Sequence, residues 1–312
     1  MSIKQLLNLK QKNLQCLLPQ LGVLAFTGND AKKFLQGQTT CNLDNADIHH
    51  SKLGAFCTIQ GRMVASFRVF LLMPDVIYLI IPKKMIPIAT DHLKNYMLFS
   101  DVVMEDISNR WQFHGVYTEN EKLFYKYFKL IENKHNAIYS KHSEYLFVMP
   151  SYIYKRYLVM TPTHQSSAIL ADTELTFDEG SPEEWALIDI LAGNPIIEPA
   201  TSKIFVPQHI NYDRVGGVDY DKGCYLGQEI IARLHYRGSS KYTTCPLHVE
   251  STSPLQAGQQ LLNQQSIAVA RIVNTVKCGN NQYAVLVMLK EDDLPLTELF
   301  TEAKQPIKIL EN

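Results

Sequence analysis

The first hundred residues alternate short apolar runs with turn residues. Apolar runs of strand length between Gly, Pro, Asn and Asp predict β-strands, whereas longer segments with one apolar face predict helices. Antiparallel strands with a helix on one face indicate an α+β fold. The pattern predicts a helix through Phe34 and Leu35, a helix near 84–97, turns at 60–61 and 74–75, and strands at 21–26, 54–60, 62–73, 76–81 and 101–106.

The middle of the chain contains the clearest helix signal. Ser181 fits the N-cap, Pro182 the first helical position and Glu184 the third position of a capping box, and Gly193 suits the C-terminal end. Apolar runs at 145–148 and 157–160 predict strands before this helix. The polar stretch between about 132 and 144 predicts a surface loop.

The last third changes from helix to strand. A helix is predicted from near Gly223 to about His235. Beyond Lys241 helical periodicity stops, and short apolar runs alternate with Gly, Asn and Pro. This pattern predicts a small β-barrel at 241–312.

Composition narrows the class of protein. Hydrophobic residues make up 46% and charged residues 20% of 312 residues, as in ordinary globular proteins. The formal charge of −1 provides no global attraction to nucleic acid or anionic lipid, so such a partner would need a local patch. Six cysteines without a CxxC pair favour a reducing cytoplasm. No segment approaches the roughly 20 apolar residues of a membrane helix, so no membrane association is expected.

Candidate chemistry concentrates at 221–238. A helix that starts near Gly223 would place Cys224 in its first turn, where the dipole and the upstream Lys222 favour a thiolate. Gln228 follows four residues later, and Glu229 and Arg233 have (i, i+4) spacing, so polar groups would gather beside a ligand. The alternative is a buried inert cysteine and a solvated ion pair. A lone cysteine cannot hold an iron–sulfur cluster, so no intrinsic metal site is expected and Cys224 could only share ligands with a partner.

Several segments together resemble a known family. They are 28–40, 61–63, 205–211, 216–217 and 221–238, and the last contains Lys-Gly-Cys-Tyr-Leu-Gly-Gln-Glu at 222–229. The chain closely resembles the YgfZ family, whose K-G-C-[FY]-x-G-Q-E signature is matched at every fixed position. That family belongs to the folate-binding relatives of the glycine-cleavage T-protein, an aminomethyltransferase.

The resemblance implies a T-protein-like fold. A discontinuous folate-binding core would comprise 1–50 and 140–240, a ferredoxin-like insertion 51–139, and a barrel 241–312. The ligand implied is tetrahydrofolate or a related folate. Trp185 matches a ligand-site tryptophan whose ring could stack on a pterin, although a helix tryptophan also commonly fills a core.

The resemblance also implies a set of binding residues and a role. Cys224 would be the essential thiol. The folate-binding residues would be Trp185, Leu21, Gln38, Lys222, Tyr225, Gln228, Glu229 and Arg233. The implied role is support of iron–sulfur enzymes, including those that thiolate tRNA. Partners would be iron–sulfur client or assembly proteins, and the protein is expected to be a monomer. Direct tRNA binding is the weakest hypothesis because the net charge is near zero.

Departures from the T-protein argue against catalysis. The T-protein glutamate before Ala-Gly is Leu191 here. A separate departure concerns the ligand site: the second ligand-site tryptophan of some YgfZ proteins falls near Leu21, so part of the aromatic platform is absent. The catalytic aspartate would fall in 82–89, which contains no acidic residue. We therefore expect a folate-binding accessory protein; the alternative is a folate-dependent one-carbon transferase or demethylase.

Overall fold

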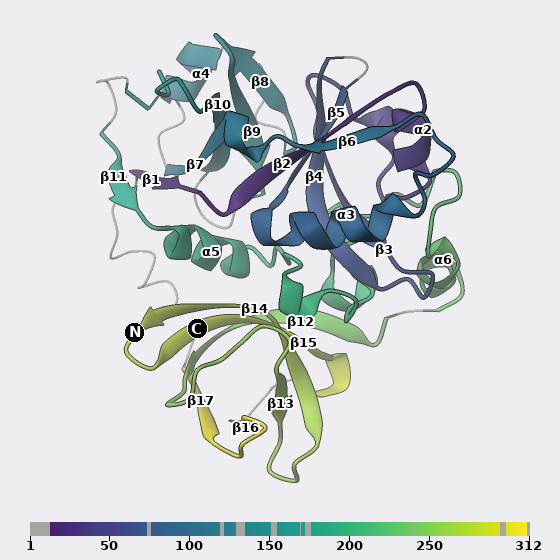
Figure 1. The fold of residues 1–312 in the computed structure, drawn as a ribbon. Helices are drawn as coiled ribbons and strands as arrows, with labels where there is room; N and C mark the ends of the chain where they lie inside the picture. The colour runs from purple at the N-terminus through teal and green to yellow at the C-terminus, as the bar shows by residue number, and fades with distance from the viewer. Residues whose placement is uncertain are drawn as a thin grey trace.

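The computed structural model describes residues 13–310 except 74–75, 119–121, 129–134, 151–154, 169, 172–175, 239 and 294–297. These residues form two open β-sheets and a closed β-barrel, with helices packed between and around them (Figure 1). No helix in the described part of the chain has the length and apolar character needed to cross a membrane. The predicted α+β class is confirmed.

The first sheet is antiparallel and has the order β3-β4-β5-β2-β6. Its strands are β2 (Leu21–Thr27), β3 (Lys52–Cys57), β4 (Met63–Met73), β5 (Val76–Pro82) and β6 (Val103–Asp106). Helices α2 (Ala31–Gln36) and α3 (Ile86–Lys94) bury Leu35, Ala89 and Leu93 in the same core as Leu79. These elements confirm the predicted pattern, while the turn predicted at 74–75 lies outside the described residues.

The second sheet has the order β11-β1-β7-β10-β9-β8. Its strands are β1 (Asn13–Leu17), β7 (Trp111–Thr118), β8 (Ile138–Lys141), β9 (Glu144–Met149), β10 (Lys155–Pro162) and β11 (Asp178–Gly180), and α4 (Lys122–Phe128) packs on one face. The surface loop predicted at 132–144 is wrong at β8. There Ile138 is buried and its amide donates to the carbonyl of His49, a contact that the local polarity did not reveal.

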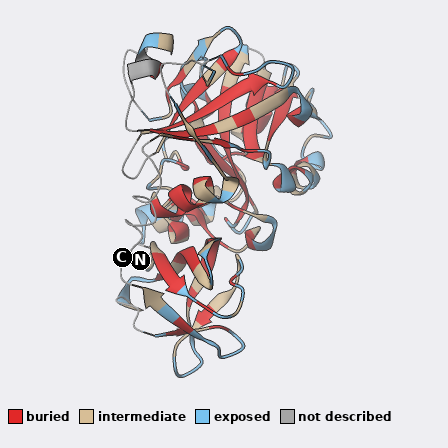
Figure 2. Ribbon diagram, turned by 90° about the vertical axis from the view of Figure 1, so that its left-hand side faces the viewer, coloured by how far each residue is buried: buried red, intermediate tan, exposed pale blue. Residues whose placement is uncertain are grey.

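The two sheets pack against each other and share a core with helix α5 (Pro182–Leu191). The capping box is confirmed, since the Ser181 hydroxyl accepts from the Glu184 amide at 3.3 Å and the Glu184 carboxylate accepts from the Ser181 amide at 2.8 Å. Figure 2 shows the resulting burial along the sheet strands and α5. The strands within 51–139 belong to both sheets, and the predicted division into core and insertion stays a prediction.

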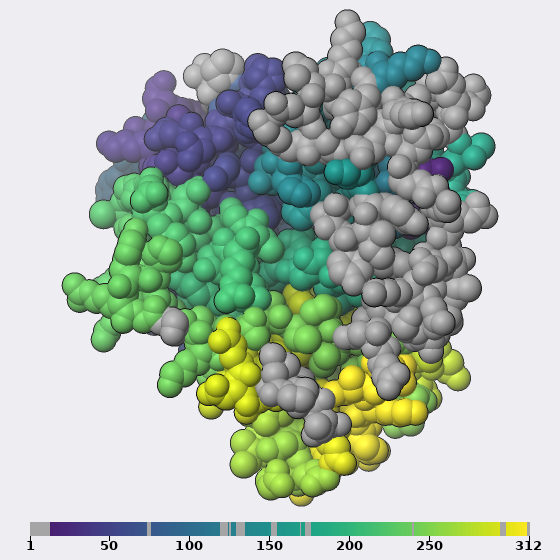
Figure 3. Space-filling model, turned by 180° about the vertical axis from the view of Figure 1, so that it is seen from behind, coloured from purple at the N-terminus to yellow at the C-terminus, as the bar shows by residue number. Residues whose placement is uncertain are grey.

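The C-terminal barrel is confirmed. It closes in the order β12-β15-β14-β13-β16-β17, with β12 (Tyr242–Glu250), β13 (Gln260–Leu262), β14 (Ala268–Gly279), β15 (Gln282–Lys290), β16 (Leu299–Phe300) and β17 (Pro306–Leu310). Its interior is apolar, and α5 packs on β14 from outside. In the view from behind, the green segment before the barrel lies between the barrel and the blue and purple N-terminal part (Figure 3).

Helix α6 (Gln228–Tyr236) begins at Gln228, so the helix start predicted near Gly223 is wrong. Gly227 has a left-handed φ of +84°, which ends any helical continuation toward the N-terminus. A Cβ at Gly227 would lie 2.3 Å from the Thr58 carbonyl oxygen, and the Leu226 amide donates to the Gly37 carbonyl at 3.1 Å. These tertiary contacts hold 222–227 as a loop.

Candidate functional site

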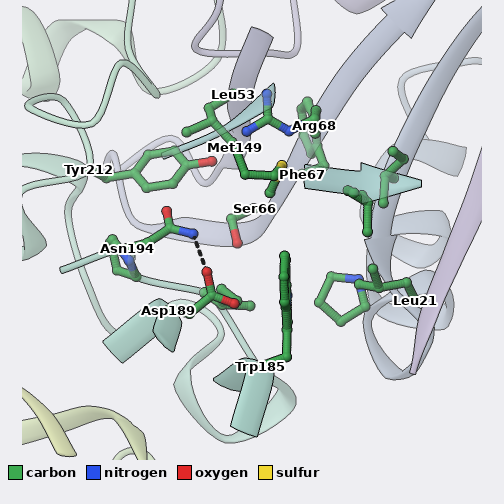
Figure 4. Close-up of a pocket in the computed structure, with 15 residues that line it drawn as sticks. Leu21, Leu53, Ser66, Phe67, Arg68, Met149, Trp185, Asp189, Asn194 and Tyr212 are labelled. Carbon is green, nitrogen blue, oxygen red and sulfur yellow. Dashed lines mark hydrogen bonds between the residues drawn. The ribbon is translucent and has the colours of Figure 1, made fainter. Parts of the chain in front are cut away.

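A central cavity lies between the two sheets, α5 and the segment after it (Figure 4). Its volume is about 90 Å³. Apolar side chains supply most of the wall, and a few polar groups converge on one side. The lining residues are Leu21, Leu53, Ser66, Phe67, Arg68, Ile80, Pro82, Met149, Leu158, Trp185, Asp189, Asn194, Pro195, Ile196 and Tyr212.

Trp185 projects from α5 into this cavity and is only 5% exposed. Its indole lies against Gly115 of β7, where an added Cβ would come within 2.4 Å of the ring. The guanidinium of Arg156 lies 4.1 Å from the ring centroid and contributes a cation–π contact. Figure 4 shows the ring edge-on, with Asp189 on one side and Leu21 on the other.

Asp189, one turn after Trp185, is the carboxylate of the cavity. One of its oxygens, Oδ1, accepts from Arg156 Nη2 at 2.9 Å and from Asn194 Nδ2 at 2.9 Å. Both Arg156 and Asp189 are buried, so this is an ion pair in a largely dry environment. Figure 4 shows the second oxygen directed toward the space beside Trp185. That oxygen is the acceptor available to a ligand.

Arg68 is a buried cation with unused donors. Its Nη1 donates to Ser51 Oγ at 2.8 Å and to Asn136 Oδ1 at 2.7 Å. Its Nε and Nη2 have no hydrogen-bond partner among the described residues. Burial lowers the pKa of the Arg68 guanidinium to about 10, which still leaves it charged at neutral pH. Unsatisfied buried donors are costly, and a ligand oxygen in the cavity would relieve that cost.

The opposite wall holds Tyr212, whose hydroxyl donates to the Gly54 carbonyl at 2.8 Å. Burial raises the pKa of this phenol, so it stays protonated. The tyrosine ring packs tightly on Gly217, where an added Cβ would lie 2.1 Å from the ring. Tyr212 is therefore held by β3 at its hydroxyl and by Gly217 of the segment after α5 at its ring.

The motif loop 222–227 lies elsewhere and shows a different arrangement from the one predicted. Cys224 is exposed and precedes α6 instead of occupying its first turn. Lys222 is half-buried, and its ammonium donates to the carbonyls of Gln36, Thr39 and Cys41 at 2.9, 2.7 and 2.7 Å. Neither the helix dipole nor Lys222 is thus placed to act on the thiol as the sequence suggested.

Burial lowers the pKa of the Lys222 ammonium to about 8, and burial also raises the pKa of the neighbouring Cys41 thiol to about 11. The Lys222 nitrogen also lies 4.9 Å from the ring of the buried Tyr225. The three carbonyl acceptors stabilise the ammonium form, because all of them direct oxygen toward the nitrogen. Lys222 therefore holds the 36–41 loop and the motif loop together through these hydrogen bonds, an arrangement here called the Lys222 tie.

The other predicted motif residues divide into loop and surface positions. Gln38 is half-buried beside the carbonyls that hold Lys222, and its Oε1 has no partner among the described residues. Gln228 Oε1 accepts from the Tyr225 amide at 3.3 Å, which stabilises the loop before α6. Glu229 and Arg233 are exposed on α6.

The structure therefore separates the predicted residues into two groups. Leu21 and Trp185 line the central cavity, whereas Gln38, Lys222, Cys224, Tyr225, Gln228, Glu229 and Arg233 belong to the motif loop and α6 and do not line it. Sequence reasoning missed Arg68, Asp189 and Asn194. The available signals were a charge inside the apolar run of β4 and a carboxylate between Ile188 and Ile190 of a buried helix.

No family model matches the chain. The glycine cleavage system aminomethyltransferase T from Bartonella henselae has the same fold, with a TM-score of 0.70 over 99% of this chain and 88% of that chain, at 11% identity. The chain is thus an aminomethyltransferase-T-like α+β protein with a closed C-terminal barrel.

Sequence relatives give the family. The tRNA-modifying protein YgfZ of Buchnera aphidicola subsp. Schizaphis graminum is 33% identical over 228 residues, 73% of this chain and 70% of the relative. The protein of the same name from Blochmanniella pennsylvanica is 31% identical over 220 residues, 69% of this chain and 66% of its own length. The chain belongs to the YgfZ family, as the motifs predicted.

Proposed function

We propose that this protein is a folate-binding accessory factor that supports iron–sulfur enzymes, including enzymes that modify tRNA. The observation that carries the folate part is a cavity lined by the flat ring of Trp185, a carboxylate, Asp189, and an incompletely bonded cation, Arg68. The relatives' name motivates the tRNA part. Cys224 is the group proposed to act on the client.

The cavity residues fit the chemistry of a reduced pterin. A pterin edge presents N–H donors that match the second oxygen of Asp189, which is directed toward the space beside Trp185, and a carbonyl oxygen that matches the unused N–H groups of Arg68. Trp185 offers an aromatic surface for the fused ring. A bound tetrahydrofolate would supply a one-carbon carrier, while this chain's residues orient it and exclude water.

The central cavity must enlarge before such a ligand can enter. About 90 Å³ is less than the roughly 150 Å³ of an engineered cavity that binds benzene, and a pterin is larger than benzene. Leu21, Met149 and Ile196 are partly buried, flexible apolar side chains of the wall and are the groups that would move. A tryptophan in place of Leu21 would fill this part of the wall. The smaller leucine of this chain leaves room for the wall to move when a ligand enters.

Cys224 suits an interaction with a partner because it is exposed on a loop held by Lys222. Within the described part of the chain, no three His, Cys, Asp or Glu side chains are grouped as a metal site. A cluster bound through Cys224 would therefore take its remaining ligands from a client or assembly protein.

Folate binding can be tested by tryptophan fluorescence. The chain has two tryptophans, so Trp111→Phe leaves Trp185 as the only reporter. Titration with 5-formyl-tetrahydrofolate should quench it with saturation. Asp189→Asn should weaken the affinity about 10- to 100-fold, as for loss of a hydrogen bond to a charged group. Glu183→Gln, an exposed acid on the same helix, is the matched control. Absence of saturable quenching would exclude folate from this cavity.

The client role can be tested by complementation. In a strain that lacks the protein, Cys224→Ala should fold normally yet fail to restore iron–sulfur enzyme activity and tRNA thiolation. Cys278→Ala removes a half-buried barrel thiol and should restore both. Full activity with Cys224→Ala would refute a role for this thiol.

A one-carbon transferase is the second candidate, and Asp189 favours it. The carboxylate absent from 82–89 has a counterpart in the cavity, contributed by α5. Its free oxygen is a group that could stabilise positive charge on a reacting folate nitrogen. Incubation with tetrahydrofolate and an aminomethyl thioether, whose one-carbon unit is already at the oxidation level of formaldehyde, separates the candidates. Only an enzyme would form methylene-tetrahydrofolate, with release of ammonia and the free thiol, and Asp189→Asn should abolish that turnover.

A further inference from the structure

A second hollow, here called the barrel groove, lies between the β3–β4 hairpin with the 204–209 segment on one side and the outer wall of the barrel on the other. Its volume is about 470 Å³, compared with about 90 Å³ for the central cavity. It has no residue in common with that cavity. Its charged and aromatic lining residues are Arg62, His209, Tyr242, Arg271, Lys290 and Asp293.

The strand register places the barrel cations along one wall. Arg271 of β14 pairs with Met288 of β15, and Lys290 lies two residues beyond Met288 on the same face. Lys290 is in turn opposite Tyr242 of β12. Arg271 and Lys290 are therefore neighbours on the outer surface, and both lie in the groove.

Arg62 approaches from the other wall. One of its guanidinium nitrogens, Nη1, donates to the Ile204 carbonyl, which holds the side chain at the groove while the residue stays exposed. His209 lies beside Tyr242, with ring centroids 4.7 Å apart and planes tilted by 41°. Burial and the nearby Arg62 lower the pKa of His209, which leaves the three longer side chains as the cations of the groove at neutral pH.

These cations are not paired with acids: among the described residues, none of Arg62, Arg271 and Lys290 takes part in an ion pair. Asp293 is the acid of the groove lining, and Glu291 and Asp292 precede it in the same short 3-10 turn. The whole chain has a formal charge of −1, so the positive charge here is a local concentration. A hollow with low-dielectric walls strengthens the field of such charges.

We propose that the barrel groove binds the phosphodiester backbone of a single-stranded RNA segment. Two arginines and a lysine on facing walls suit successive phosphates, and Tyr242 and His209 add an aromatic surface that a base can contact. The groove is independent of the folate cavity, so failure of folate binding leaves this proposal standing. The barrel groove is also the local positive patch that a chain of nearly zero net charge would need in order to bind nucleic acid.

The salt dependence of binding gives the first test. Anisotropy of a fluorescein-labelled twelve-nucleotide oligouridylate should report binding whose affinity falls with salt. Three phosphate contacts predict a slope of about −2 in log K against log salt, or a loss of about 18-fold between 50 and 200 mM. A slope near zero, or no binding at 50 mM salt, would overturn the proposal.

Paired variants locate the site. Arg271→Gln with Lys290→Gln should lower affinity at least about tenfold and reduce the slope to about −0.7, the value for one remaining contact. Lys277→Gln with Lys308→Gln removes two exposed barrel cations outside the groove and changes the net charge equally. Equal losses in both pairs would indicate a general charge effect and refute the assignment. Equal competition by a polyglutamate peptide would instead identify a carboxylate site.

Discussion

The tie formed by Lys222 gives the strongest prediction, because it contradicts the role that its place beside Cys224 suggests. Lys222→Met keeps the length of the side chain and removes all three donors to the 36–41 loop. Each hydrogen bond to a charged group contributes about 1.5–3 kcal/mol. The cost of burying the ammonium offsets much of the sum. We expect a net loss of about 2–4 kcal/mol in the free energy of unfolding.

Two measurements separate a tie from a thiol activator. Urea unfolding should show a lower midpoint for Lys222→Met with an unchanged slope, whereas Lys241→Met, an exposed lysine on the following segment, should leave the midpoint unchanged. Alkylation of Cys224 by iodoacetamide should be as fast as in the unmodified protein, or faster as the loop loosens. Unchanged stability together with slower alkylation would refute the tie and restore the activating role.

Lys222→Arg sharpens the same prediction. A planar guanidinium cannot direct its donors at three carbonyls around one point as an ammonium does. We therefore expect a loss of stability despite the preserved charge, and an Arg variant as stable as the native chain would show that charge alone matters at this position.

Three further predictions concern the same region and its surroundings. With Ellman's reagent at pH 8, Cys224 should react first, while buried thiols such as Cys41, whose pKa is about 11, should react only after unfolding; simultaneous reaction would contradict the burial pattern. Gly227→Ala should destabilise the protein by more than about 1 kcal/mol because of its φ of +84° and the clash with Thr58, whereas Gly223→Ala, with no atom within 4 Å, should have little effect on the urea midpoint. Burial lowers the pKa of His209, so the unfolded chain takes up its proton at a higher pH than the folded chain; stability should fall as pH drops below about 6.5, by at most about 1.4 kcal/mol per pH unit, and His209→Gln should reduce that slope.

The sequence by itself determined the local elements and the family. Apolar periodicity located the strands of the first sheet, and Ser181 with Glu184 located the start of α5, because this capping box is formed by two residues only three positions apart. The motif at 222–229 identified the family because its residues are consecutive, so the match can be made without knowing the fold. The barrel was also predictable, since its strands follow one another along the chain.

Only the tertiary structure decided where the chemistry lies. The start of α6 depends on contacts of Gly227 with Thr58, which are 169 residues apart, and no local propensity encodes them. The Lys222 tie and the meeting of Arg68 with Asp189 in one cavity likewise join distant segments. A charged residue within an apolar run indicates a buried charge. Which residue pairs with that charge depends on how the two sheets pack, which the sequence does not show. The positions of functional groups here follow from those long-range contacts.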